Sequence, residues 1–254
     1  MSELLQGGIV GGKKAPQAVV LVGGQGTRLR ALVSDRPKPM VEVASRPFLE
    51  WLLAGLRADG VLRVVLCIGH MGQVVRAHFR DGSNLGQEIA YSEDPELLGT
   101  GGALRKALPL LETDPVLVLN GDSYCEVDVP AFLAWHQERK ARGSLALVHV
   151  PDTGRYGRVH LDGSGRILHF EEKGRSDPGW INAGVYLLAR PLVASIPADR
   201  AVSIERELFP DWVEAGLYGF PTPGRFIDIG TPESYLQAES FFLGMGGVGS
   251  RGDR

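Results

Sequence analysis

The sequence has little cysteine, no long apolar run and no excess of charge of one sign. Its two cysteines, Cys67 and Cys125, lack the spacing of a metal site, and free thiols suit a reducing compartment. No apolar stretch is long enough to cross a bilayer. Lys13 and Lys14 are not followed by the apolar segment of a signal peptide. We therefore expect a cytoplasmic protein without a membrane partner.

The charge balance excludes a strong global field. The 27 Lys and Arg and the 30 Asp and Glu of the 254 residues give a formal net charge of -3. Such a chain has no electrostatic attraction for nucleic acid, so nucleic acid is not expected as a partner. An anionic substrate must instead be bound by a local cluster of cations.

The first part of the chain alternates between apolar runs of strand length and helical segments. Apolar runs predict buried strands at residues 18–22, 63–68, 116–119 and 145–150, with a shorter strand at 89–91. Helical patterns lie between them, at residues 47–56, 71–79, 102–111 and 130–142. This alternation predicts an α/β fold with a mostly parallel central sheet covered on both faces.

The second part of the chain predicts a small antiparallel part. Two short strands flank a Gly-rich turn at 162–165 and predict a hairpin. A strand at 181–188, a helix at 204–214, extended pieces at 219–226 and a helix at 232–242 follow. We expect a single domain over 17–243, a disordered N-terminus over 1–16 and a flexible Gly-rich tail over 244–254.

A glycine-rich loop directly follows the first predicted strand, and it reads Gly23-Gly24-Gln25-Gly26-Thr27-Arg28-Leu29. Its three glycines allow the backbone to approach a phosphate closely, at the strand end where open α/β sheets bind ligands. The P-loop ending is absent, and Leu29 stands where a dinucleotide fingerprint needs a third glycine. The alternative is a tight turn without a ligand. We interpret the loop as a phosphate loop of another kind, with a built-in arginine.

A single lysine stands between two prolines ten residues further on, in Arg36-Pro37-Lys38-Pro39-Met40. The prolines hold the backbone extended and stiff around Lys38. A lone lysine is usually a solvated surface charge. Together with Arg28, however, Lys38 can form a cationic clamp for a triphosphate.

These two motifs resemble the signature of the sugar-1-phosphate nucleotidyltransferases, and the resemblance covers residues 18–238. It implies a Rossmann-like α/β/α sandwich with a small antiparallel sugar-binding part. It also implies transfer of a nucleoside monophosphate from an NTP to a sugar 1-phosphate, with release of pyrophosphate. The resemblance implies that Arg28 and Lys38 bind the triphosphate. It also implies that the nucleotide-binding loop contains Gly23, Gly24, Gly26 and Thr27.

Two aspartates follow apolar strand ends, Asp122 in Asn120-Gly121-Asp122 and Asp228 in Asp228-Ile229-Gly230-Thr231-Pro232. Each alone fits a helix cap or a turn. Two carboxylates at strand ends can also share one Mg²⁺, whose other ligands are waters and substrate phosphates. The resemblance makes Asp122 and Asp228 the metal ligands and Mg²⁺ the cofactor.

The resemblance also assigns the sugar side. Glu172-Lys173 matches the family's Glu-Lys pair, with the glutamate on sugar hydroxyls and the lysine on the sugar phosphate. Gly157 and Asn182 match positions that line the sugar pocket. The alternative for the charged pair is an exposed strand end.

On the base side, Gly99 and Thr100 belong to a second glycine-rich segment, which the resemblance places over the nucleobase. Glu93 and Asp94 lie just before this segment. A carboxylate here can accept from guanine N1–H and the exocyclic amine but would be repelled by the carbonyls of uracil. We therefore predict GTP as the nucleotide; a solvated acidic loop is the alternative.

Within the family, the segments around Tyr91, Asn120, Ser203 and Phe226 resemble the D-glycero-α-D-manno-heptose 1-phosphate guanylyltransferases. The resemblance implies a role in bacterial surface polysaccharide synthesis. The alternative within the class is uridylyl or thymidylyl transfer to a hexose or amino-sugar 1-phosphate. Alternatives outside it are a nucleotide-sugar sensor and a nicotinamide oxidoreductase, which Leu29 disfavours. The sequence leaves the oligomeric state open, a homo-oligomer included.

Overall fold

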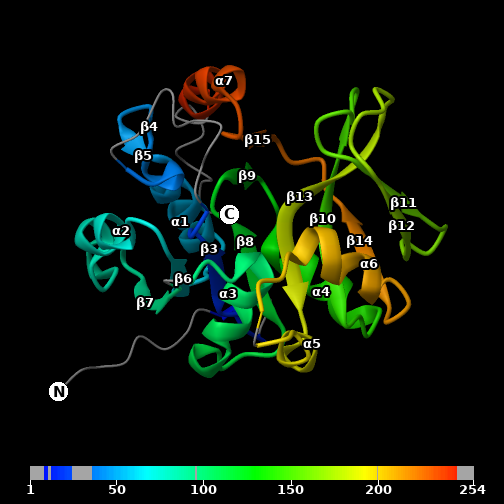
Figure 1. The fold of residues 1–254 in the computed structure, drawn as a ribbon, viewed down its shortest axis with the longest axis horizontal. Helices are drawn as coiled ribbons and strands as arrows, with labels where there is room; N and C mark the ends of the chain where they lie inside the picture. Colours follow the sequence, from blue (N-terminus) through cyan, green and yellow to red (C-terminus); the bar gives the residue numbers. More distant parts are fainter. Residues whose placement is uncertain (1–8, 11–12, 25–35, 95, 199, 245–254) are drawn as a thin grey trace, which may run out of the picture.

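The structure is a computed structural model, and it describes residues 9–10, 13–24, 36–94, 96–198 and 200–244. Its centre is a seven-stranded sheet in the order β14-β10-β13-β8-β3-β6-β7 (Figure 1). The strands are β3 (Ala18–Leu21), β6 (Arg63–Ile68), β7 (Glu88–Glu93), β8 (Val116–Asn120), β10 (Gly143–Val150), β13 (Gly179–Leu188) and β14 (Leu217–Pro221).

The sheet is mostly parallel. Strand β3 pairs in parallel with β6 and β8, β6 with β7, and β10 with β14. Only β13 runs antiparallel to its two neighbours in this sheet, β8 and β10. The carboxyl ends of β3, β6, β7 and β8 therefore meet at one edge, which is where a ligand binds in sheets of this type.

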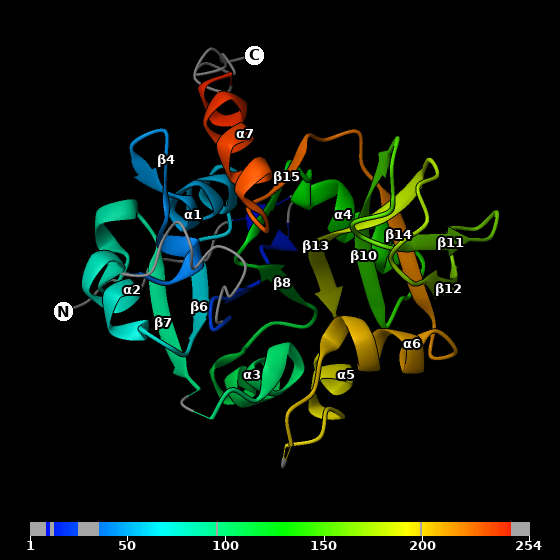
Figure 2. The ribbon, with the colours of Figure 1, turned by 45° about the horizontal axis from the view of Figure 1, so that its top comes forward.

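Helices cover both faces of the sheet. Within β3, Ala18 and Val20 join one core cluster and Val19 and Leu21 the other, as alternation along a strand requires. Figure 2 shows the two helical layers. One face carries α1 (Phe48–Ala58), α2 (Gly72–Phe79), α4 (Val129–Glu138) and α7 (Pro232–Leu243). The other face carries α3 (Gly99–Ala107), α5 (Arg190–Ala194) and α6 (Phe209–Trp212). The predicted α/β/α sandwich is confirmed.

Short antiparallel pairs complete the described part. Strands β11 (Arg158–Leu161) and β12 (Ile167–Glu171) form the predicted hairpin. Strand β9 (Ser123–Cys125) pairs with β15 (Phe226–Asp228), which brings two distant segments together. The remaining pairs are β1 (Ile9–Val10) with β2 (Lys13–Lys14) and β4 (Glu42–Val43) with β5 (Arg46–Pro47). Single turns of 3-10 helix occur at η1 (Lys38–Met40), η2 (Ser83–Leu85) and η3 (Leu108–Leu110).

Some element boundaries differ from the prediction. The helix expected over 204–214 is a π-helical segment, η4 (Ile204–Leu208), followed by α6. The amides of Leu208 and Phe209 reach back five residues, to Ser203 and Ile204, and Pro210 has no N–H to donate. At the N-terminus, β1 pairs with β2. Residues 1–8, 11–12 and 245–254 lie outside the described residues, so the disorder predicted over 1–16 and the flexible tail predicted over 244–254 stay predictions.

Within the described part of the chain, no helix combines the length and the apolarity needed to cross a membrane.

Candidate active site

A cleft of about 480 Å³ opens at the carboxyl ends of the parallel strands. Gly23 and Gly24 after β3, Ile68 at the end of β6, Asp94 after β7 and Asn120 at the end of β8 line it. The predicted phosphate loop therefore borders the cleft where its first two glycines are described. The residues predicted to continue it, Gly26, Thr27 and Arg28, lie outside the described residues.

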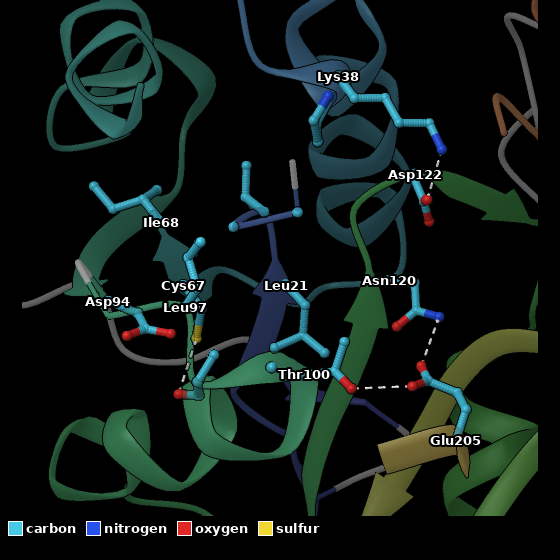
Figure 3. A pocket seen from close by; sticks show the side chains of 16 residues that line it. Leu21, Lys38, Cys67, Ile68, Asp94, Leu97, Thr100, Asn120, Asp122 and Glu205 are labelled. Atoms are coloured by element: carbon cyan, nitrogen blue, oxygen red, sulfur yellow. Dashed lines mark hydrogen bonds and ion pairs between the residues drawn. The ribbon is translucent and has the colours of Figure 1, made fainter. Parts of the chain in front are cut away.

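Lys38 enters this cleft and forms an ion pair with Asp122. The lysine Nζ lies 2.7 Å from Asp122 Oδ2 (Figure 3). The Lys38 side chain is only 12% exposed, whereas that of Asp122 is 48% exposed. Pro37 and Pro39 are buried on either side of the lysine, so its backbone is held by packing. A largely desolvated cation is thus fixed beside the predicted phosphate loop.

The structure brings Asp228 next to Asp122. Asp228 on β15 lies opposite Ser123 on β9, and the Ile229 amide donates to the Asp122 carbonyl oxygen at 3.0 Å. A Cβ on Gly230 would stand 2.5 Å from Asp228 Oδ1 and 3.8 Å from Lys38 Nζ. Both aspartates and the lysine therefore surround one small region.

The two carboxylates nevertheless face different spaces. Asp122 lines the main cleft, whereas Asp228 lines a neighbouring cavity of about 340 Å³ together with Arg155 and Tyr156. Asp228 accepts from Arg155 Nη2 at 3.0 and 3.1 Å, from the Tyr156 hydroxyl at 2.5 Å and from the Gly230 amide at 2.7 Å. Burial and the hydrogen bond to Asp228 raise the pKa of Tyr156, so the tyrosine is a donor at neutral pH.

The donor set fits a hard divalent cation in part. The described residues contain no group of three or more His, Cys, Asp or Glu side chains placed to hold a metal. Asp228 at the end of β15 and Asp122 directly before β9 supply oxygen ligands of the kind that Mg²⁺ prefers. The half-exposed Asp122 carboxylate is open to the cleft. The remaining ligands would have to be water and substrate phosphate, as is usual for this ion.

A polar network that the sequence did not predict lies on one flank of the cleft. Glu205 on η4 accepts from Asn120 Nδ2 at 3.2 Å, Thr100 Oγ1 at 3.0 Å and the Tyr186 hydroxyl at 3.4 Å. The buried Asn120 Oδ1 has no hydrogen-bond partner among the described residues. Figure 3 shows Asn120 and Glu205 on the flank opposite Asp94, Leu97 and Cys67. This flank presents fixed acceptors to a ligand that carries donors.

Thr100 and Asn182 of this network were predicted site residues, whereas Glu205 was not. A signal for Glu205 in the sequence is Ser203, which caps η4 and thereby holds Glu205 at the first turn. Cys67 in the cleft is no nucleophile, because burial and nearby Asp94 raise the pKa of its thiol to about 12.

The predicted sugar-side residues do not line the main cleft. Asn182 donates to the Tyr186 hydroxyl at 3.1 Å and so belongs to the polar network behind it. Glu172 and Lys173 are exposed after β12. Gly157 has φ +81°, and a Cβ there would stand 2.6 Å from the Glu171 carbonyl oxygen. A Cβ on Gly157 would also stand 3.7 Å from the Lys173 amide nitrogen, so Gly157 and Lys173 lie beside the segment that carries Arg155 and Tyr156.

On the base side, the structure separates Glu93 from the cleft. Glu93 is exposed, pairs with Arg76 and is absent from the cleft lining, so the geometry does not support contact with a base. Its neighbour Asp94 is 6% exposed and lines the cleft. The Asp94 carboxylate accepts from the Leu98 amide at 2.7 Å and the Glu96 amide at 3.2 Å, which fixes the loop before α3. Gly99 and Thr100 line the cleft as predicted.

Comparison with known proteins assigns the family. The family described as Nucleotidyl transferase matches residues 17–244. The chain belongs to this family. It is 39% identical to a mannose-1-phosphate guanylyltransferase of Mycobacterium tuberculosis over 88% of the chain but only 63% of that protein's length. It is 34% identical to a D-glycero-alpha-D-manno-heptose 1-phosphate guanylyltransferase of Campylobacter jejuni, over 86% of the chain and 96% of that protein.

A solved structure agrees with the fold. The crystal structure of HddC from Yersinia pseudotuberculosis complexed with GMP-PN superposes with a TM-score of 0.81 at 33% identity, covering 89% of this chain and 99% of that one. The resemblance seen in the two sequence motifs is thus confirmed at the level of family and fold. The roles of single residues remain predictions.

Proposed function

We propose that the protein transfers GMP from GTP to a manno-configured sugar 1-phosphate, D-glycero-α-D-manno-heptose 1-phosphate, to give GDP-heptose for bacterial surface polysaccharide. The observation that carries the proposal is the Lys38–Asp122 ion pair beside Asp228, at the phosphate-binding edge of the sheet. The relatives that transfer GMP support the choice of nucleotide. Cys67 and Cys125 are both free thiols, which fits a cytoplasmic location.

The reaction requires that two anions meet at one phosphorus. An oxygen of the sugar phosphate attacks the α-phosphorus of GTP, the bond to the bridging oxygen of the β-phosphate breaks, and pyrophosphate leaves with that electron pair. The attacking phosphate is already ionised at neutral pH, so no strong general base and no protein nucleophile is needed. The protein must align the two substrates and offset their charge.

Lys38 supplies a fixed positive charge for the triphosphate at the site of attack. Burial of its aliphatic part and the flanking prolines hold the ammonium group without reorganisation. Asp122 and Asp228 would hold Mg²⁺, which supplies further positive charge on the phosphate oxygens. The proposed sugar-phosphate contacts are Lys173 and Glu172 from the β12 side, with Gly157 and Asn182 behind them. Asn120 and Glu205, which line the cleft, would accept hydrogen bonds from substrate hydroxyls.

A second substrate, mannose 1-phosphate, is supported by the relative at 39% identity. The heptose assignment rests on the Campylobacter relative, which matches this chain over 96% of its own length, whereas the chain spans 63% of the mannose relative. Uridylyl or thymidylyl transfer is the alternative in base, and GTP is preferred because both named relatives are guanylyltransferases.

A pyrophosphate-release panel tests the proposal. Wild-type protein and Asp122→Asn are each incubated with MgCl₂, one of ATP, GTP, UTP or dTTP, and one of heptose, mannose or glucose 1-phosphate. We expect release with GTP and a manno-configured sugar phosphate, fastest with the heptose, and at least a hundredfold less from the variant. Release with UTP or dTTP alone would support the alternative base. No release from any pair would instead support a nucleotide-sugar sensor on the same fold.

A further inference from the structure

Arg155 forms an ion pair with Asp228, the carboxylate that is a metal ligand in the proposed function. Its Nη2 lies 3.0 Å from Asp228 Oδ1 and 3.1 Å from Asp228 Oδ2, so one nitrogen contacts both oxygens. The Asp228 side chain is 14% exposed and that of Arg155 is 48% exposed. The arginine therefore covers Asp228 from the side of the second cavity, which both residues line.

The other bonds to Asp228 leave little room for a second cation. The Tyr156 hydroxyl donates a hydrogen bond to Asp228 Oδ2, and the Gly230 amide donates one to Asp228 Oδ1. Ser234 Oγ lies a further 3.4 Å from Oδ1. These three donors are neutral, and their residues are buried or half-buried, whereas Arg155 is charged and exposed. Arg155 and Tyr156 stand on the same turn between β10 and β11. Arg155 is thus the one of the four partners that can leave without breaking a buried contact.

We propose that Arg155 is a positioning residue that holds Asp228 in the metal-free protein and competes with the divalent cation for this carboxylate. A guanidinium at hydrogen-bond distance from Asp228 stands within a few ångströms of any ion bound there, and like charges at that separation repel. The neutral donors Tyr156 and Gly230 keep Asp228 oriented after the arginine leaves. The inference rests on the proposed function, because it takes Asp228 as a metal ligand.

The test is the affinity for Mn²⁺, measured without nucleotide by the electron paramagnetic resonance signal of the free ion. We expect Arg155→Ala to bind Mn²⁺ more tightly than the wild type, on the order of tenfold, because one nearby positive charge has been removed. Arg155→Lys keeps the charge but loses the planar fork, and we expect it to bind within about threefold of the wild type. Thermal unfolding of each variant shows whether it is folded.

Arg175→Ala is the matched control. Arg175 lies on the turn after β12 and pairs with Glu171 at 3.1 Å, so its removal changes the net charge equally without touching Asp228. Its Mn²⁺ affinity should equal that of the wild type. If Arg155→Ala binds no tighter than the wild type, or if Arg155→Lys binds as tightly as Arg155→Ala, the inference is overturned.

Asp228→Asn separates this inference from the proposed function. If Asp228→Asn binds Mn²⁺ more weakly and Arg155→Ala binds it no more tightly than the wild type, Asp228 is a metal ligand but Arg155 does not compete with the metal. If the Mn²⁺ affinity of Asp228→Asn equals that of the wild type, Asp228 is not a metal ligand, and the inference about Arg155 is overturned as well.

Discussion

The backbone amide of Ile229 donates a hydrogen bond to the carbonyl oxygen of Asp122 at 3.0 Å. This bond continues the pairing of β15 with β9 and fixes the register in which Asp228 faces Ser123. Two aspartates more than one hundred positions apart in the chain, Asp122 directly before β9 and Asp228 at the end of β15, are thereby held close together. The proposed charge arrangement depends on this pairing.

Asp122→Asn is expected to lower kcat by about 10²–10³ without unfolding the protein. The amide keeps the shape of the side chain but removes both the charge that pairs with Lys38 and the proposed metal ligand. Steady-state pyrophosphate release with GTP and the sugar phosphate measures the effect. Asp211→Asn, at an exposed position of α6, is the matched control and should retain wild-type kcat. Equal losses in both variants would contradict the assignment.

Lys38→Gln should raise the KM for GTP and lower kcat/KM for GTP by about ten- to a hundredfold, because a desolvated cation beside the phosphate loop is lost. Arg36→Gln removes a neighbouring cation whose Nη1 pairs with Glu42 at 3.2 Å. It should change kcat/KM by less than about threefold. Wild-type kinetics in Lys38→Gln would show that Lys38 does not act on the triphosphate.

Glu205→Gln tests the flank formed by Glu205 and Asn120. The carboxylate accepts hydrogen bonds from Asn120, Thr100 and Tyr186 through both of its oxygens. The glutamine side chain has only one acceptor oxygen, because its second terminal atom is a donor nitrogen. We expect a roughly tenfold rise in the KM for the sugar 1-phosphate, with the KM for GTP nearly unchanged. Glu207→Gln, whose carboxylate pairs with Arg200 at 2.7 Å, is the control from the same segment. A rise confined to the KM for GTP would assign this flank to the nucleotide instead.

Asp94→Asn and Glu93→Gln separate the two acidic residues before α3. Asp94 holds the loop through the Leu98 and Glu96 amides, so its amide variant should raise the KM for GTP by about tenfold. Glu93→Gln changes only a contact with Arg76 outside the cleft and should leave the preference for GTP over UTP unchanged. A loss of that preference in Glu93→Gln would support the contact with the base that the sequence suggested for Glu93 and Asp94.

Stability should fall as the pH falls from about 6.5 to about 4, partly through His136. Burial lowers the pKa of His136 from 6.5 to about 4, and its Nδ1 lies 2.9 Å from Ser144 Oγ. Below pH 6.5 the unfolded chain binds a proton that the folded histidine does not, so the free energy of unfolding decreases by roughly 3 kcal/mol over this interval. Urea unfolding at pH 7, 6 and 5 measures the slope.

His136→Asn should flatten that slope, whereas His70→Asn, at an exposed position, should not. An unchanged slope in His136→Asn would mean that other groups account for the acid sensitivity.

The strands of the main sheet were predictable because their side chains are apolar on both faces. Arg63–Ile68 was predicted with its observed bounds, and the strand ending before Asp122 is one residue longer than predicted. Local patterns also gave the hairpin and the mostly parallel sheet. They could not give the pairing of β9 with β15, because three-residue strands carry no periodicity and their partners are far apart in the chain.

The site was predictable only where a residue type and its local setting both point to a ligand. Lys38 between two prolines and Asp122 after a buried strand meet that condition, and the structure joins them. Glu205 and Arg155 were missed because a single charged residue on a turn or short helix usually faces solvent. Of the two acidic residues predicted before α3, Asp94 lines the cleft and Glu93 is exposed at the end of β7, which the sequence could not distinguish.

The most direct measurement is the product mass after incubation of the wild type and Asp122→Asn with GTP, MgCl₂ and D-glycero-α-D-manno-heptose 1-phosphate. Our account predicts GDP-heptose and an equal amount of pyrophosphate from the wild type, and almost no product from Asp122→Asn in the same time. GDP-heptose formed equally fast by both proteins, or no nucleotide-sugar from the wild type with this or the mannose substrate, would contradict it.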